Sequence, residues 1–370
     1  MDNYSYIRKT ITWEGRRYEV RGKTEKEACE QLAELISALN HGEYATSGNT
    51  TVDQWFAQWK ATYKEPSGIT KKSLGLYDEK YHRYIGPNIG GMHLKDVRDL
   101  HLQSLLNTQA GMSFSHVTKL RMVMQELFRQ ARRSRLIIYD PAEGLQLPDS
   151  IKRSHRPITE EERSHILTVA KTHPSGLWVL TILYTGLRPG ESAALLWKDV
   201  DFKHNEIHVY KAVESGSNSI KAPKTPAGFR DIPMRQELRD RMLEVQGEPL
   251  TPVFPSTNGG IRSANSVRRL WNSFAKALDL HMGAKISKGK ILEHAIAQDL
   301  TPYCLRHTFC TDLQRAGVPI NVAKELMGHA NISVTANIYT HRDQTVLHSN
   351  MKKLDTTGRK KVGKIRANSV

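Results

Sequence analysis

Three short segments in the second half of the chain carry polar side chains among apolar ones. In LYTGLRPGESAALLW, Arg188 follows an apolar run and a glycine and precedes a Pro–Gly turn. In LTPYCLRHTFCTDL, Arg306 lies beside leucine and phenylalanine residues that are spaced four apart, as on one face of a helix. In LMGHANISVTANIYTH, His329 follows a glycine and Tyr339 ends a short polar run. An arginine buried in this way needs a partner, and its planar fork of donors matches the oxygens of a phosphate.

Taken singly, each of these residues has an ordinary explanation, such as a salt bridge, a helix cap or a core position. In this order, however, TGLRPGE, LRHTF, LMGH and IYTH resemble the motifs of the tyrosine recombinases, or phage-type integrases. The resemblance covers about residues 157–345, and four ordered motifs are a far more specific signal than one. It implies a site-specific recombinase, the integrase of a phage or conjugative transposon, that integrates or excises a mobile element.

The resemblance also implies how the DNA is cut. A tyrosine oxygen, here that of Tyr339, attacks a phosphodiester and leaves a 3′-phosphotyrosyl protein and a free 5′-hydroxyl. Attack by the hydroxyl of another strand then rejoins the DNA. No metal, cofactor or nucleotide is expected, because the covalent intermediate keeps the energy of the broken bond. Since tyrosine titrates near ~10, Tyr339 needs cationic neighbours or a base at neutral pH.

Other site residues follow from the same motifs. Arg188 and Arg306 match the two arginines that stabilise the negative charge of the transition state. Arg306 is thus expected to point at phosphate rather than to pair inside the protein. His329 matches a residue that donates a hydrogen bond to the same phosphate, and Glu191 matches an acidic position that braces the active-site arginine or histidine.

The leaving 5′-oxygen needs a proton, which in this family comes from a lysine on a β-hairpin. The segment SIKAPKTPAGFRDIPM predicts such a hairpin, with residues 225–228 as its turn. Lys224, immediately before the turn, is the first candidate, and Lys221 is the second.

One position departs from the family pattern. Tyr303 stands three residues before the second arginine, where the family usually has a histidine. A tyrosine can donate or accept a hydrogen bond but does not titrate easily near pH 7, so we expect Tyr303 to orient the phosphate or Tyr339. His307 could substitute as a base, although on a helix it points about 100° away from Arg306. We expect reduced dependence on a base rather than loss of activity.

Composition agrees with a nucleic-acid partner. The 370 residues include 54 Lys and Arg against 38 Asp and Glu, a formal charge of +16, which suits a nucleic acid or an anionic membrane. The longest apolar run, GLWVLTILYTGL, is too short to cross a bilayer. Cys29, Cys304 and Cys310 form neither a C-x-x-C pair nor a zinc spacing, which favours the reducing cytoplasm, here that of a bacterial host. No carboxylate cluster or histidine pair has ligand spacing, which disfavours a metal-dependent nuclease.

Residues 1–48 predict a small domain of a three-stranded sheet plus a helix, and the resemblance implies that this domain binds arm-type DNA sites. YIRKTITW and RRYEVRG are rich in β-forming residues, and Thr24 with Glu27 forms a capping box that opens the helix. The basic strand residues could face DNA or simply be solvated, and the two readings stay open. These residues are Arg8, Lys9, Arg16, Arg17 and Arg21.

Residues 49–148 predict an all-α domain that binds the core site. Aromatic residues at helical spacing, such as Trp55, Phe56, Trp59 and Tyr63, are expected in its core rather than stacked on bases. A helix over 115–133 is expected to contact phosphates, because a cluster of cations there faces one acid, Glu126. The cations are Lys119, Arg121, Arg129, Arg132 and Arg133, with Arg135 in the turn that follows.

A basic, polar linker over 149–157 separates this domain from a mixed α+β catalytic domain over 158–350, which a Thr159–Glu162 capping box opens. Its C-terminal helix could pack on a neighbouring protomer of a DNA-bound tetramer or on its own core. A basic tail follows over 355–370. The expected fold is thus multidomain, with a small β-sheet plus helix, an all-α core-binding domain and an α+β catalytic domain.

The expected partners are double-stranded DNA at core-type and arm-type attachment sites, further copies of the chain in a tetramer, and, as candidates, an excisionase and a host DNA-bending protein. Two other functions remain open. A type IB topoisomerase-like enzyme shares the tyrosine chemistry but does not need the N-terminal domain. A catalytically inactive regulator would bind a specific site without forming a covalent adduct.

Overall fold

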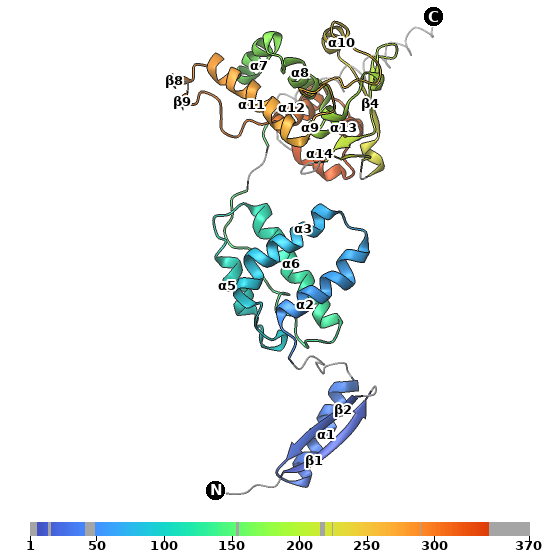
Figure 1. The fold of residues 1–370 in the computed structure, drawn as a ribbon, viewed down its shortest axis with the longest axis vertical. Coiled ribbons are helices and arrows are strands. Elements are labelled where there is room, and N and C mark those ends of the chain that lie inside the picture. Colours follow the sequence, from blue (N-terminus) through green and yellow to red (C-terminus); the bar gives the residue numbers. More distant parts are fainter. Residues whose placement is uncertain are drawn as a thin grey trace, which may run out of the picture. The chain divides into compact units, whose positions relative to one another are not determined.

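A computed structural model describes residues 6–13, 16–40, 49–152, 155–214, 219–223, 225–288 and 290–339, without the side chains of Arg16, Asn40 and Tyr339. The chain divides into two compact units, Met1–Arg153 and Ser154–Val370, whose elements are labelled in Figure 1. The division falls within the stretch expected to be a linker. No helix of the described ranges is long and apolar enough to cross a membrane.

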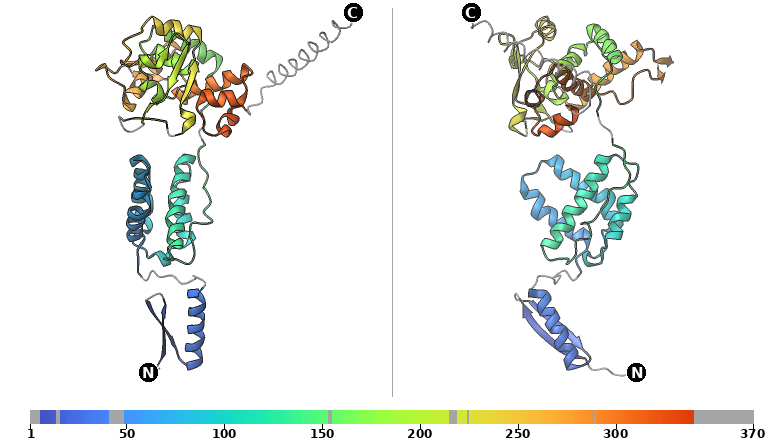
Figure 2. Two further views of the ribbon diagram at one scale, coloured as in Figure 1. Left: turned by 90° about the vertical axis from the view of Figure 1, so that its right-hand side faces the viewer. Right: turned by 180° about the vertical axis from the view of Figure 1, so that it is seen from behind.

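The N-terminal part is a β-ribbon with a helix along it. Strands β1 (Ile7–Trp13) and β2 (Arg16–Gly22) pair antiparallel, and α1 (Glu25–Asn40) packs against them (Figure 2). The described residues form two strands there rather than the predicted three. Residues 1–5 and 41–48 lie outside the description, and between them the chain offers only two β-forming runs. The α1 helix begins as predicted, because the Glu27 backbone N–H donates to Thr24 Oγ1 at 3.2 Å.

The second part of this unit is all helical. Its helices are α2 (Val52–Trp59), α3 (Lys71–Lys80), α4 (Gly86–Ile89), α5 (Asp99–Asn107) and α6 (Phe114–Arg133). Trp55, Phe56 and Trp59 are buried, which confirms their predicted place in the core, whereas Tyr63 is exposed. The Phe56 ring stacks on Tyr81 with centroids 3.6 Å apart. The aromatic residues therefore hold this bundle together rather than form a platform for bases.

The C-terminal unit is mixed α+β. Its helices are α7 (Glu160–Thr172), α8 (Gly176–Thr185), α9 (Pro189–Ala194), α10 (Gln236–Leu243), α11 (Ala264–His281), α12 (Pro302–Arg315), α13 (Ile320–Met327) and α14 (Ile332–Tyr339). The apolar helix α8 is buried along nearly its whole length and packs against α7, α10 and α12. It forms the centre of a core that positions the site.

Short antiparallel strands complete this unit. The strands are β3 (Val200–Asp201), β4 (Glu206–Val209), β5 (Ala212–Val213), β6 (Ile220–Lys221), β7 (Arg230–Pro233), β8 (Lys285–Ser287) and β9 (Lys290–Glu293). They pair as β3-β4-β7, β5-β6 and β8-β9.

The predicted hairpin across residues 219–234 is wrong. The two strands that flank its turn have different partners, because β6 pairs with β5 and β7 pairs with β4. Pro223 and Pro226 lie between the two strands and have no N–H to donate to a ladder. Lys221 does lie on a hairpin strand, but that hairpin is β5–β6.

Candidate active site and DNA-facing surfaces

Arg188 is fixed at the start of a short helix. The α8 helix ends at Gly186, whose φ of +63° lies in the left-handed region that glycine adopts readily. The α9 helix begins three residues later, directly after Arg188. The Arg188 backbone N–H donates to Glu191 Oε2 at 2.8 Å, and its Nη1 donates to Glu191 Oε1 at 2.7 Å. Glu191 is buried, so one internal carboxylate holds both the backbone and the guanidinium of Arg188.

Arg306 lies inside the protein on α12, and only 5% of it is exposed. Its Nη1 donates to the carbonyl of Gly186, and its Nη2 donates to the carbonyl of Met327 and to His329 Nε2 at 3.0 Å. The expectation that Arg306 makes no internal pairs is therefore wrong, because a buried guanidinium must satisfy its donors. Burial, together with the charge of Arg188, lowers the pKa of Arg306 to about 9, so that it remains a cation at neutral pH.

A third arginine, which the sequence did not single out, completes the group. Arg230 on β7 has a side chain that is 1% exposed, and its Nη2 donates to Glu191 Oε2 at 2.8 Å. Its Nη1 donates to Glu191 Oε1 and to the Gly228 carbonyl, each at 3.3 Å. Its spacing from Ile232 could have indicated this position. Residues two apart on a strand point to the same face, and Arg230 lies on the inner face with Ile232.

The three arginines meet at one helix end. The last carbonyls of a helix have no partner within it and carry its negative dipole. At the end of α13, the Leu326 carbonyl accepts from Arg230 Nε at 2.8 Å, and the Gly328 carbonyl accepts from Arg188 Nη2 at 2.9 Å. The Met327 carbonyl between them accepts from Arg306. Three consecutive carbonyls thus orient three guanidiniums that come from three other elements.

Charge in this cluster is unbalanced. Burial alone would raise the pKa of Glu191, but the bonds and charge of Arg230 and the charges of Arg188 and Arg306 hold it at about 2. One permanent anion therefore faces three cations. The excess positive charge lies where a phosphate could neutralise it.

His329 follows α13 and is neutral at pH 7. Burial and the three nearby arginines lower its pKa to about 4. Its Nε2 can accept from Arg306 only when unprotonated, so Nδ1 carries the proton and donates to Thr335 Oγ1 at 3.0 Å. In this arrangement His329 orients Arg306, and its Nε2 has no proton to donate to a phosphate as the sequence suggested.

These residues open into a cavity of about 470 Å³. Its lining brings together Arg188, Tyr303, Arg306, His307, His329 and His155 with residues of α13, α14 and the turn between them. His307 therefore lies in the same cavity as Arg306, although it was expected to point away from it. Sequence reasoning missed His155, whose ring lies 5.1 Å from that of half-exposed Tyr303 and nearly parallel to it.

The candidate nucleophile and proton donor lie at the limits of the described structure. Tyr339 is the last residue of α14, and Val334 and Ile338 of this helix line the cavity. The Tyr339 side chain and the whole of Lys224 lie outside the described residues. Lys221 Nζ forms an ion pair with Glu214 Oε2 at 2.7 Å.

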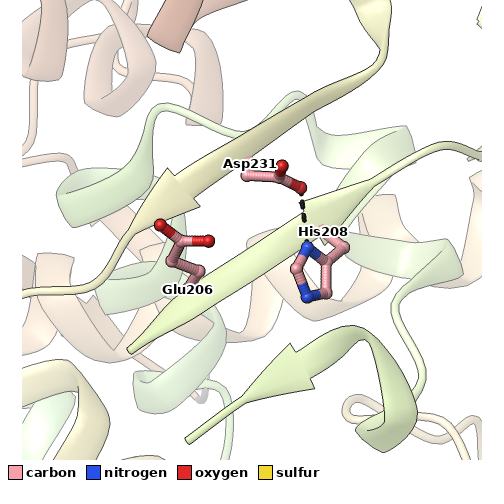
Figure 3. A group of neighbouring side chains, drawn as sticks. All are labelled: Glu206, His208 and Asp231. Atoms are coloured by element: carbon pink, nitrogen blue, oxygen red, sulfur yellow. Dashed lines mark hydrogen bonds and ion pairs between the residues drawn. The ribbon is translucent and has the colours of Figure 1, made fainter. Parts of the chain in front are cut away.

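A separate polar group lies on the outer face of the β3-β4-β7 sheet (Figure 3). The ligand atoms of Glu206, His208 and Asp231 lie within 4.8 Å of one another, a spacing that could hold a metal ion. Local spacing could not reveal this group, because Asp231 comes from the neighbouring strand. His208 Nδ1 bonds Asp231 Oδ1 at 2.6 Å as a cross-strand pair. Glu206, His208 and Asp231 alternate along their strands with the inward-facing Ile207 and Arg230. The sheet therefore separates this polar group from the arginine cluster.

The N-terminal ribbon has one polar face. Arg8 lies opposite Arg21 in the register and Arg17 lies opposite Thr12, and all four are exposed, on the face away from the half-buried Ile11 and Tyr18. Glu19 on this face pairs with Arg21 at 2.6 Å and with Arg8 at 3.9 Å. Lys9 is half-buried on the other face and pairs with Glu25 at 3.1 Å, so it cannot share a DNA contact with Arg8. The Arg16 side chain lies outside the description.

Helix α6 carries exposed cations opposite its buried stripe. Lys119, Arg129, Arg132 and Arg133 are exposed and fall within an arc of about 140° on the side away from Leu120. Within the described ranges, Arg132 pairs with Glu143 at 3.6 Å, whereas Lys119, Arg129 and Arg133 form no ion pair. Two other residues of this helix form bonds within the protein, one a cation predicted to contact phosphate and the other its acidic neighbour. Arg121 is half-buried and donates to the Leu145 carbonyl, and Glu126 pairs with Lys64.

This unit brings two arginines and a neutral histidine together beside a helix that ends in a tyrosine, which are the residue types that the resemblance to tyrosine recombinases predicts. The sequence profile of the phage integrase family matches residues 156–345. That match covers half of the chain, so the protein belongs to the phage integrase family and is a site-specific recombinase of the tyrosine class.

Individual relatives agree. A tyrosine recombinase XerC-like protein of Caldanaerobacter subterraneus subsp. tengcongensis is 26% identical over 349 residues, which cover 88% of each chain. The transposase from transposon Tn916 of Enterococcus faecalis is 28% identical over 206 residues, 54% of this chain and 51% of that protein.

Solved structures share the fold. The Tn1549 transposon integrase in complex with transposon right end DNA superposes with a TM-score of 0.66 at 22% identity, covering 83% of this chain and 100% of that one. A lambda integrase tetramer bound to a Holliday junction gives 0.56 at 18% identity, covering 90% and 93%. The multidomain fold expected from the sequence is therefore confirmed.

Proposed function

We propose that this protein is the integrase of a mobile element and that it cuts and rejoins DNA through a 3′-phosphotyrosyl bond to Tyr339. The observation that carries the proposal is the convergence of Arg188, Arg306 and His329 on one cavity bordered by the helix that ends at Tyr339. The names of the relatives, an integrase and a transposase of transposons among them, support a mobile element as the substrate.

The donors that remain in the cluster suit a bound phosphate. A guanidinium has five N–H donors. Arg188 uses two of them, toward Glu191 and Gly328, and its side chain is 37% exposed. Arg306 uses three, which leaves its Nε and one Nη1 donor. A phosphate in the cavity would therefore receive donors from both arginines without displacing the bonds that orient them.

In the proposed reaction the Tyr339 oxygen attacks phosphorus, and the bond from phosphorus to the 5′-oxygen breaks. Arg188 and Arg306 stabilise the additional negative charge on the non-bridging oxygens, a contribution of about 3–4 kcal/mol for each preorganised donor group. The proton of Tyr339 leaves to a base in the cavity or to solvent, and the 5′-oxygen receives a proton from Lys224 or, failing that, Lys221. This scheme requires neither a metal ion nor a nucleotide.

We further propose how the other parts contact DNA. The exposed ribbon face with Arg8, Arg17 and Arg21 would bind arm-type sites, and the cationic arc of α6 would contact phosphates of the core site. Recombination would take place in a tetramer of this chain on two duplexes. A topoisomerase-like activity is less well supported, because the named relatives are recombinases, transposases and integrases.

A nicked duplex carrying the DNA that flanks the gene tests this function, since the nick prevents religation and traps the covalent adduct. Wild type is expected to give an adduct on a denaturing gel, and Tyr339→Phe is expected to give none. Tyr303→Phe is the matched control because it removes the hydroxyl of the tyrosine that lines the cavity, and it should still give the adduct. Specific binding without an adduct by wild type would instead identify an inactive regulator.

A further inference from the structure

We infer that Arg230 is a positioning residue for strand cleavage: it balances Glu191 and anchors the end of α13, so that Arg188 stays oriented with donors left for the phosphate. This inference rests on the proposed function. Most site residues expected from the motifs are groups that touch DNA, whereas Arg230, like Glu191, acts through other residues.

The bonds and burial of Arg230 leave it one unused donor and almost no exposed surface to offer DNA. Four of its five donors point to protein atoms, namely two to Glu191 and one each to the carbonyls of Gly228 and Leu326. Its side chain is 1% exposed. Its loss should therefore change the cleavage rate much more than the affinity for DNA.

Glu191 is the first of its two targets. Each carboxylate oxygen of Glu191 accepts one bond from Arg188 and one from Arg230. Without Arg230, the buried carboxylate would have Arg188 as its one directly bonded cation. The pair would then tighten, and Arg188 would be drawn away from the phosphate that it must share.

The turn after α13 is the second target. Arg230 holds the Leu326 carbonyl, the first of the three carbonyls that also bind Arg306 and Arg188. The guanidinium also packs against Gly328, whose φ is +63° and where a Cβ would lie 2.8 Å from Nη1. Loss of Arg230 would free this turn, and with it His329 and the carbonyls that aim both catalytic arginines.

The test measures single-turnover adduct formation at saturating protein, together with the Kd, on a nicked duplex of the DNA flanking the gene. We expect Arg230→Met to form the adduct about 100-fold more slowly, with Kd changed by less than about threefold. Arg230→Lys keeps the charge without the fork of donors and should fall between. Arg235→Met removes the same charge from an exposed arginine of this unit and should cleave like wild type.

A second variant separates positioning from simple stabilisation. Adding Glu191→Gln to Arg230→Met should restore part of the rate, because a neutral amide no longer draws Arg188 inward. If Arg230 only stabilised the fold, loss of a second buried partner would slow cleavage further.

Wild-type rates in Arg230→Met, or a double variant slower than the single one, would overturn the inference. If Arg230→Met does not fold, Arg230→Lys decides, since a wild-type rate overturns the inference and a slow rate at unchanged Kd supports it. No adduct from wild type would remove the proposed function and this inference together.

Discussion

Replacing Gly328 by alanine should distort the turn after α13, which orients the arginines of the site. The residue has φ +63°, which costs an L-amino acid about 1–2 kcal/mol. A Cβ there would lie 2.8 Å from Arg230 Nη1 and 3.1 Å from the Ala227 carbonyl oxygen, whereas ordinary contact begins at 3.4 Å, so the guanidinium must retreat by about 0.6 Å. A displacement on this scale is enough to distort the bonds from Arg230 to Glu191, which span 2.8 and 3.3 Å. Because misplacement of about 1 Å can cost 100-fold in rate, we expect adduct formation to slow by about that factor.

Gly283 supplies a matched control in the same unit. It also has positive φ, +100°, but a Cβ there would meet nothing within 4 Å. Gly283→Ala should therefore lower the melting temperature through backbone strain alone and leave single-turnover cleavage of the nicked duplex unchanged. Gly328→Ala should lose both stability and cleavage. Cleavage by Gly328→Ala within about threefold of wild type, at full DNA occupancy, would refute the view that the turn after α13 aims the catalytic arginines.

Three other predictions concern Arg306, His329 and the N-terminal ribbon. Arg306→Lys should slow adduct formation about 100- to 1,000-fold, because one ammonium cannot reach all three partners of the guanidinium; a loss below tenfold in single-turnover assays would contradict this. As pH drops from 6.5 to 4, the melting temperature of wild type should fall more than that of His329→Asn. The cause is that His329 binds a proton in the unfolded chain but stays neutral in the native protein, where its pKa is lowered to about 4. An equal fall in both melting temperatures would show that the neutral state of His329 does not affect stability. Arg17→Ala with Arg21→Ala should weaken DNA binding and lower its salt slope by about one per lost phosphate contact, whereas Lys9→Ala, on the opposite face, should bind like wild type in the same titration.

Local pattern was sufficient to predict much of the fold. Helix α6 was expected over 115–133 and is Phe114–Arg133, because its apolar stripe repeats at helical spacing. The Thr159–Glu162 capping box also opens α7 as expected. Both signals lie within a few residues of the structure that they specify, so a single sequence can reveal them.

The errors come from contacts that are long-range in sequence. Arg230 is adjacent to Glu191 only because β7 pairs with β4 and lies beside the end of α13. Two of the three partners of Arg306 are carbonyls, and any residue can supply a carbonyl, so no side-chain pattern marks them. The hairpin error has the same origin, because the turn at residues 225–228 is real but does not determine which strands pair.

The most direct test of the central claim is to locate the atom that joins protein to DNA. The trapped complex would be digested with protease and nuclease, and the nucleotide-bearing peptide would be sequenced by mass spectrometry. We predict a nucleotide attached through its 3′-phosphate to the Tyr339 oxygen, with a free 5′-hydroxyl on the other DNA end. A nucleotide on Tyr303 or any other residue, or a 5′-phosphate linkage, would contradict it.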